Sequence, residues 1–121
     1  MPKLRVRNQT RDTVLADRAD IADTAQLRNR GLLKRTGLDD GEGLWIVPCE
    51  GVHTIGMKFP IDVVFLSKKR KVLKIRQEMP KWRMAVCLRG HSVLELPAGM
   101  CQKALTIVGD QLEFEKYEAE P

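Results

Sequence analysis

Two cysteines are each followed by a histidine four positions later, Cys49 by His53 and Cys87 by His91. Thiolate sulfur and imidazole nitrogen are ligands that tetrahedral zinc prefers, so the two pairs could together hold one metal ion. The spacing differs from the C-x-x-C knuckle of structural zinc sites, and an extended strand would separate the members of each pair by about 13 Å. We therefore predict no metal site and keep zinc as an alternative.

Cys49, His53 and Asp62 also supply the residue types of a nucleophile, a base and an orienting carboxylate. A hydrolase of this kind needs its thiol within hydrogen-bond reach of the base. No nucleophile elbow or obvious oxyanion loop follows Cys49, and a free cysteine is commonly a small apolar filler. A hydrolase-like or metal-dependent enzyme using these residues is therefore the alternative to a non-catalytic function.

Two carboxylates lie inside apolar segments, Asp62 in "PIDVVFL" and Glu95 in "VLELPAG". An unpaired buried charge is costly, so each carboxylate needs a basic side chain, a backbone amide or water as its partner. One interpretation is that each carboxylate is paired and stabilises the fold. The other is a polar pocket in which Asp62, Glu95 and His53 converge and an arginine binds an anionic group.

The elements that position these residues mostly show a two-residue period of apolar and polar side chains, which is typical of strands. Strands are predicted at residues 3–7, 43–47, 61–66, 72–79, 92–97 and 111–117. The basic run "KKRK" is predicted as the turn of a hairpin between the third and fourth of these strands.

A helix is predicted from about Asp20 to Gly31, with Asp20 or Asp23 as its N-cap, and a short second helix within 97–105. Together the elements predict a single α+β domain that is mainly β. We expect a compact antiparallel sheet or a partly closed barrel, with one main helix packed on it.

The composition is that of one ordinary domain spanning 1–121, with 43% hydrophobic and 31% charged residues. No apolar run approaches the ~20 residues of a membrane span, and the N-terminal residues lack the apolar region of a secretory signal. Three widely spaced cysteines do not make a disulfide framework. We therefore expect a cytoplasmic protein without a membrane partner.

The net charge of +5 could favour an anionic partner such as nucleic acid. The single basic run is Lys68–Lys71, and Trp82 beside Arg83 could stack on a base. An aromatic fraction of 5% is low for a surface built on stacking, and no nucleic-acid, P-loop or Rossmann motif is present. We expect no nucleic-acid partner and no cofactor, and keep binding through the basic run and Trp82 as a weaker alternative.

Six segments occur in the order expected for one known family. They are "RGLL" (30–33), "GLW" (43–45), "HTIGMKFPIDVVFL" (53–66), "PKWR" (80–83), "LELPAG" (94–99) and "GD" (109–110). Over about residues 10–117 the chain resembles the domain of unknown function 192 family, small proteins of bacteria and archaea. The resemblance implies a compact β-rich domain with one helix, and no assigned activity.

The positions matched to the family motifs include no nucleophile; they are Met57, Asp62, Glu95, Pro97 and Gly99. Many members of the family carry a bulky aromatic residue near the position of His53, which argues against an essential catalytic histidine. We therefore expect a small non-catalytic binding domain, a monomer or weak dimer, whose partner is a small molecule or a protein. Its ligand would be an anionic small molecule or a peptide, in a pocket formed by His53, Met57, Asp62, Arg83 and Glu95.

Overall fold

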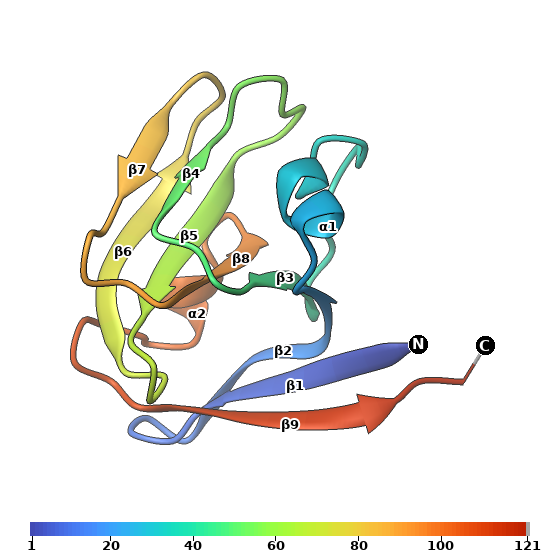
Figure 1. Ribbon diagram of the computed structural model, residues 1–121. Helices are drawn as coiled ribbons and strands as arrows, with labels where there is room; N and C mark the ends of the chain where they lie inside the picture. Colours follow the sequence, from blue (N-terminus) through green and yellow to red (C-terminus); the bar gives the residue numbers. More distant parts are fainter. Residues whose placement is uncertain (121) are drawn as a thin grey trace.

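The computed structural model describes residues 1–120, which form one open, mixed seven-stranded sheet with a two-stranded ribbon beside it (Figure 1). The sheet order is β6-β5-β8-β3-β2-β1-β9. Its strands are β1 (Pro2–Asn8), β2 (Thr13–Ala22), β3 (Glu42–Ile46), β5 (Ile61–Leu66), β6 (Val72–Met79), β8 (Ser92–Pro97) and β9 (Leu112–Glu118). The ribbon pairs β4 (Gly51–His53) with β7 (Met84–Val86), and the helices are α1 (Ala25–Arg30) and α2 (Met100–Lys103).

The predicted α+β, mainly-β class is confirmed, in the form of an open sheet whose edges are β6 and β9. The predicted strands at 61–66 and 92–97 are β5 and β8, which pair with each other, and every residue in them is buried. The predicted hairpin joins β5 to β6 through the basic turn, where Arg70 has a φ of 66°. The short second helix is also present, as α2.

The prediction that the main helix begins near Asp20 is wrong, because residues up to Ala22 belong to β2. β2 pairs with β1 on one side and runs parallel to β3 on the other, and these ladders outweigh the local helical pattern. The helix begins after Thr24, whose hydroxyl accepts a hydrogen bond from the Leu27 N–H at 3.2 Å, and ends at Gly31. A parallel pair needs a crossover connection, and α1 lies in the one between β2 and β3.

The sheet separates two apolar cores. On one face, α2 packs with Met100 and Cys101 against a cluster that includes Val64 and Leu94. On the other face, α1, the segment after it and the β4–β7 ribbon cover a cluster that includes Val63 and Phe65 (Figure 1). Successive residues of a strand point to opposite faces, so each polar residue in β5 or β8 is committed to one core or the other.

Asp62 points into the core beside α2, because it lies opposite Leu96 in the β5–β8 ladder. Its side chain is fully buried and accepts three backbone hydrogen bonds, from Glu78 at 2.7 Å, Gly99 at 3.0 Å and Cys101 at 2.9 Å. These donors come from the end of β6 and from the start of α2. One carboxyl group therefore joins three segments that are distant in the sequence.

We expect Asp62→Asn to lower the free energy of unfolding by about 3 kcal/mol, because the amide group brings a donor to backbone N–H groups that need acceptors. Urea denaturation measures the change. The matched control is Asp39→Asn at an exposed position, which should stay within about 0.5 kcal/mol of the wild type. Equal stability of the two variants would contradict the role given to Asp62.

Candidate functional site

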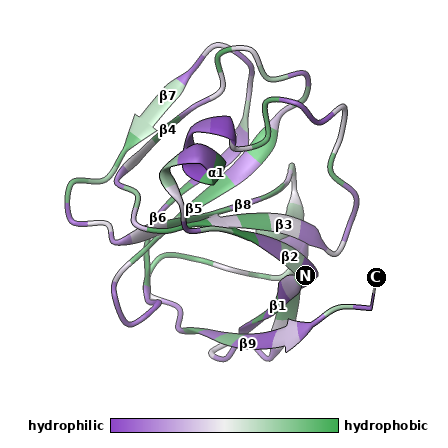
Figure 2. Cartoon of the chain, turned by 45° about the vertical axis from the view of Figure 1, so that its right-hand side comes forward, coloured by the Kyte–Doolittle hydropathy of each residue, from purple (hydrophilic) through white to green (hydrophobic). Residues whose placement is uncertain are grey.

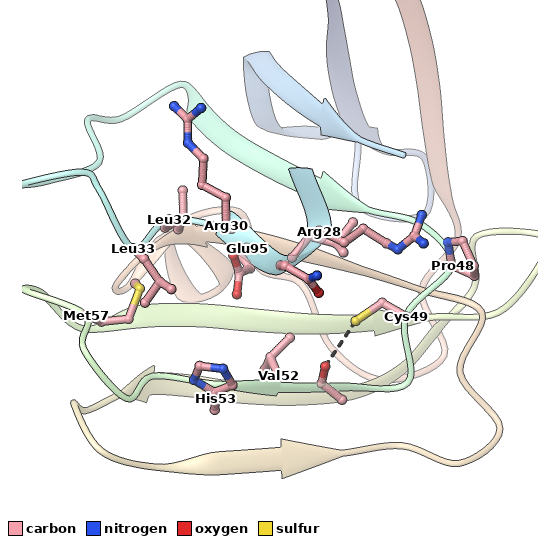
Figure 3. A pocket seen from close by; sticks show the side chains of 14 residues that line it. Arg28, Arg30, Leu32, Leu33, Pro48, Cys49, Val52, His53, Met57 and Glu95 are labelled. Carbon is pink, nitrogen blue, oxygen red and sulfur yellow. Dashed lines mark hydrogen bonds between the residues drawn. The ribbon is translucent and has the colours of Figure 1, made fainter. Parts of the chain in front are cut away.

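A pocket of about 310 Å³ lies on the α1 side of the sheet, between α1, the β3–β4 connection and β8 (Figure 3). Its walls come from segments distant in the sequence, which the β2–α1–β3 crossover and the ribbon bring together. The lining residues are Arg28, Asn29, Arg30, Gly31, Leu32, Leu33, Ile46, Pro48, Cys49, Gly51, Val52, His53, Met57 and Glu95. Most of the wall is apolar, with a few polar groups among them, as is usual in small-molecule sites.

Glu95 is the buried polar group of this pocket. It sits on β8 between Leu44 of β3 and Val63 of β5, which places its side chain on the α1 side of the sheet. The side chain is only 4% exposed, and its Oε1 has no hydrogen-bond partner among residues 1–120. Burial raises the pKa of Glu95 to about 7, and the positive charge of Arg35 offsets only part of that rise.

Arg28 supplies positive charge at one end of the pocket, close to Pro48 (Figure 3). Its Nη1 donates to the carbonyl oxygens of Asp23 at 3.1 Å and Val47 at 3.4 Å, and it forms no ion pair with a carboxylate of residues 1–120. Arg30 also borders the pocket, but its guanidinium extends away from the other labelled side chains (Figure 3). Arg28 is therefore the arginine that an anionic group inside the pocket would meet.

Cys49 and His53 both border the pocket, and Val52 lies between them in the view of Figure 3. The Cys49 thiol donates to the Gly51 carbonyl at 3.1 Å, and burial raises the pKa of this thiol, so the nucleophilic thiolate is disfavoured. No hydrogen bond joins Cys49 to His53. Within residues 1–120, no three His, Cys, Asp or Glu side chains group into a metal site. The arrangement lacks the thiol–base contact that a hydrolase of this type needs.

Three of the five residues expected to form a pocket line it: His53, Met57 and Glu95. Asp62 does not converge with Glu95, because the two carboxyl groups lie on opposite faces of the sheet. Arg83 lies outside the pocket, where its exposed side chain donates to the Trp82 carbonyl at 3.3 Å.

Sequence reasoning missed the part of the wall made by α1 and the turn after it, above all Arg28 and Leu32. A signal for this wall was present, since "RGLL" is one of the segments matched to the family. The position of this wall beside Glu95 depends on the parallel pairing of β2 with β3. The periodicity of the sequence does not reveal that pairing.

Comparison with known proteins gives one family match over most of the chain. The model of the DUF192 family, described as "Uncharacterized ACR, COG1430", matches residues 6–114. A "UPF0127 protein" from Thermococcus sibiricus is 31% identical over 117 residues, which cover 92% of this chain and 75% of the relative. The family match spans both α1 and β8, so the pocket lies within the matched region.

Two solved structures share the fold. A protein of unknown function from Novosphingobium aromaticivorans has a TM-score of 0.79 at 23% identity, covering 92% of this chain and 83% of its own. A protein from Sinorhizobium meliloti, described as a proposed transcription regulator, has a TM-score of 0.82 at 18% identity and covers 94% of each chain. At these identities the similarity establishes the fold alone.

The raised pKa of Glu95 predicts a specific pH dependence of stability. The native state holds this proton more tightly than the unfolded state, whose Glu pKa is near 4.5, so stability falls as pH rises from 4.5 to about 7 and is then constant. At about 1.4 kcal/mol per pKa unit, the loss is about 3 kcal/mol. Glu95→Gln has no such proton. We therefore expect its stability relative to wild type to improve by about 2–3 kcal/mol between about pH 5 and about pH 8.

Urea denaturation of both proteins at the two pH values measures this change, and the shared response of other groups cancels in the difference. Asp20 and Asp110, whose pKa values are lowered by their hydrogen-bonded partners, titrate equally in both proteins. A wild-type-to-variant difference that is the same at both pH values would contradict the assignment of a buried, unpartnered carboxyl to Glu95.

Proposed function

Because this chain belongs to the DUF192 family, which has no assigned activity, we propose its function from the pocket: it is a non-catalytic binding domain that holds a small ligand between α1 and β8. The ligand is a small molecule or the end of a peptide. It carries an anionic group, a hydrogen-bond donor and a short apolar body.

The observation that carries this proposal is the buried carboxyl of Glu95, which has an unpartnered oxygen at the wall of a cavity. A buried polar group without a partner destabilises the folded state, and binding a donor would remove that cost. Such groups are uncommon in folded proteins and are typically explained by a ligand, an ion or a water molecule. Glu95 is therefore the group around which the ligand would be recognised.

The other properties of the ligand follow from the positions of the remaining polar and apolar groups. Arg28 lies at the Pro48 end and has no carboxylate partner among residues 1–120, so it favours an anionic group there. Apolar side chains from three segments would enclose the body of the ligand; they are Leu32, Leu33, Ile46, Val52 and Met57. The pocket thus offers complementary partners to a molecule such as an aliphatic amino acid.

Binding rather than catalysis is supported by the chemistry of the wall. The Cys49 thiol has a raised pKa and is hydrogen-bonded to a backbone carbonyl, so it is a poor nucleophile. Glu95 lies on β8, which pairs with β3 on one side and β5 on the other, and every residue of β8 is buried. A rigid, largely apolar cavity with one or two oriented polar groups suits selective binding of a small molecule.

Three probes of nearly equal shape test the ligand class: leucine, 4-methylpentanoate, which lacks the ammonium, and isoamylamine, which lacks the carboxylate. We expect leucine to shift the backbone amide NMR signals of the residues that line the pocket, and each of the other two probes to bind more weakly. Glu95→Gln and Arg28→Gln should each weaken leucine binding by about tenfold or more, since each removes a charge-assisted hydrogen bond.

The matched control is Arg30→Gln, because this arginine lies on the same helix but its guanidinium points away from the pocket (Figure 3). Leucine binding to this variant should equal that of wild type. Signals that stay unchanged with all three probes, or an equal loss of binding in the Arg28 and Arg30 variants, would refute the proposed function.

A further inference from the structure

Four large apolar side chains are exposed on β7 and the turns that flank it, and we name them the apolar stripe: Trp82, Met84, Val86 and Leu88. They are 66%, 67%, 52% and 82% exposed, whereas Ala85 between them is buried against the core. Strand alternation places Met84 and Val86 on the side opposite Ala85, and Trp82 and Leu88 lie in the turns that flank β7. Apolar side chains gathered in this way on one surface are typical of an interaction site.

The stripe lies at an outer corner of the molecule, away from both chain termini. β7 occupies this corner in both views of the whole chain (Figures 1 and 2). Backbone hydrogen bonds extend the ribbon beyond β7, from Thr54 N–H to the Arg83 carbonyl and from Cys87 N–H to the Glu50 carbonyl. Hydrogen bonds to the β4 side of the ribbon therefore hold the segment that carries the stripe in place.

Positive charge predominates in the segment that carries the stripe, and exposed Glu50 across the ribbon is an acidic neighbour. Residues 80–91 contain Lys81, Arg83 and Arg89 and no Asp or Glu. None of these three cations forms an ion pair within residues 1–120. The surface that complements this segment is therefore negatively charged and accepts apolar side chains at the same time.

We propose that the apolar stripe docks peripherally on the surface of an anionic lipid bilayer. Trp82 would sit at the headgroup level, where amphipathic indole rings are favoured, and the aliphatic side chains would reach the acyl boundary. Lys81, Arg83 and Arg89 would lie against the anionic headgroups, each cation strengthening binding by about fivefold. This proposal replaces the expectation from sequence of no membrane partner and is independent of the ligand held by the pocket.

A bilayer fits these observations better than a second copy of the chain. Two copies meeting through their stripes would bring the same three cations together, and like charges across an interface oppose association. A bilayer surface also requires no matching shape, which suits a stripe on a projecting ribbon (Figure 1). No helix within residues 1–120 has the length and apolar character needed to cross a membrane.

Co-sedimentation with vesicles tests the proposal. We expect the wild-type chain to sediment with mixed phosphatidylglycerol–phosphatidylcholine vesicles, much less with pure phosphatidylcholine vesicles, and less as salt concentration rises. Tryptophan emission should shift to the blue on the mixed vesicles, because Trp82 leaves water. The double variant Met84→Asn with Leu88→Asn should lose about tenfold or more in vesicle affinity.

The matched control carries Leu105→Asn with Ile107→Asn, two changes of the same kind at exposed positions outside the ribbon. It should bind vesicles as wild type does, and circular dichroism melting should show that both double variants are folded. Absence of wild-type binding to the mixed vesicles, or an equal loss in the control, would overturn the proposal. A wild-type dimer that becomes monomeric in the stripe variant, without vesicle binding, would instead assign the stripe to a second copy.

Discussion

β8 is hydrogen-bonded to β3 on one side and to β5 on the other, and this double pairing determines where the carboxyl of Glu95 points. β8 cannot shift by one residue against these neighbours without turning every one of its side chains to the other face. Both faces of β8 are buried, so such a shift would turn Glu95 into the core beside α2 and disrupt the packing of both cores. The position of the pocket, the enclosure of Glu95 and its raised pKa all depend on this register.

Asp62 and Glu95 show how the surroundings of a buried carboxyl decide its role. They occupy adjacent strands and are both nearly inaccessible to water. Asp62 accepts three backbone hydrogen bonds and joins β5, β6 and α2, so its role is structural. Glu95 has an unpartnered oxygen at a cavity, so the fold bears a cost there that a ligand would remove. Proteins commonly concentrate such costs at functional sites.

The parts of the fold that could be predicted from sequence are those where local pattern and tertiary structure agree. The largely apolar segments of β5 and β8 and the alternation in β6 and β9 predict strands correctly. The segment from Asp20 to Ala22 satisfies both a helical and an extended pattern, and only its pairing with β3 decides for the strand. Local periodicity contains no information about that partner.

The candidate site, like the fold, could be predicted from sequence only where it does not depend on strand pairing. His53, Met57 and Glu95 were expected in one pocket with Asp62 and Arg83, and these three line it. The separation of Asp62 from Glu95 depends on the β5–β8 register, which a single sequence does not specify. Arg28 could not be assigned to the site before the crossover of α1 over the sheet was known.

The most direct test of this account is the titration of the Glu95 side-chain carboxyl itself, followed by its carbon-13 NMR signal in the ligand-free protein. We expect a midpoint near 7, because the group is buried with an unpartnered oxygen. A midpoint near the ordinary glutamate value of 4.5 would mean that the carboxyl is solvated or paired. That result would contradict the pocket as the binding site and leave Glu95 without a special role.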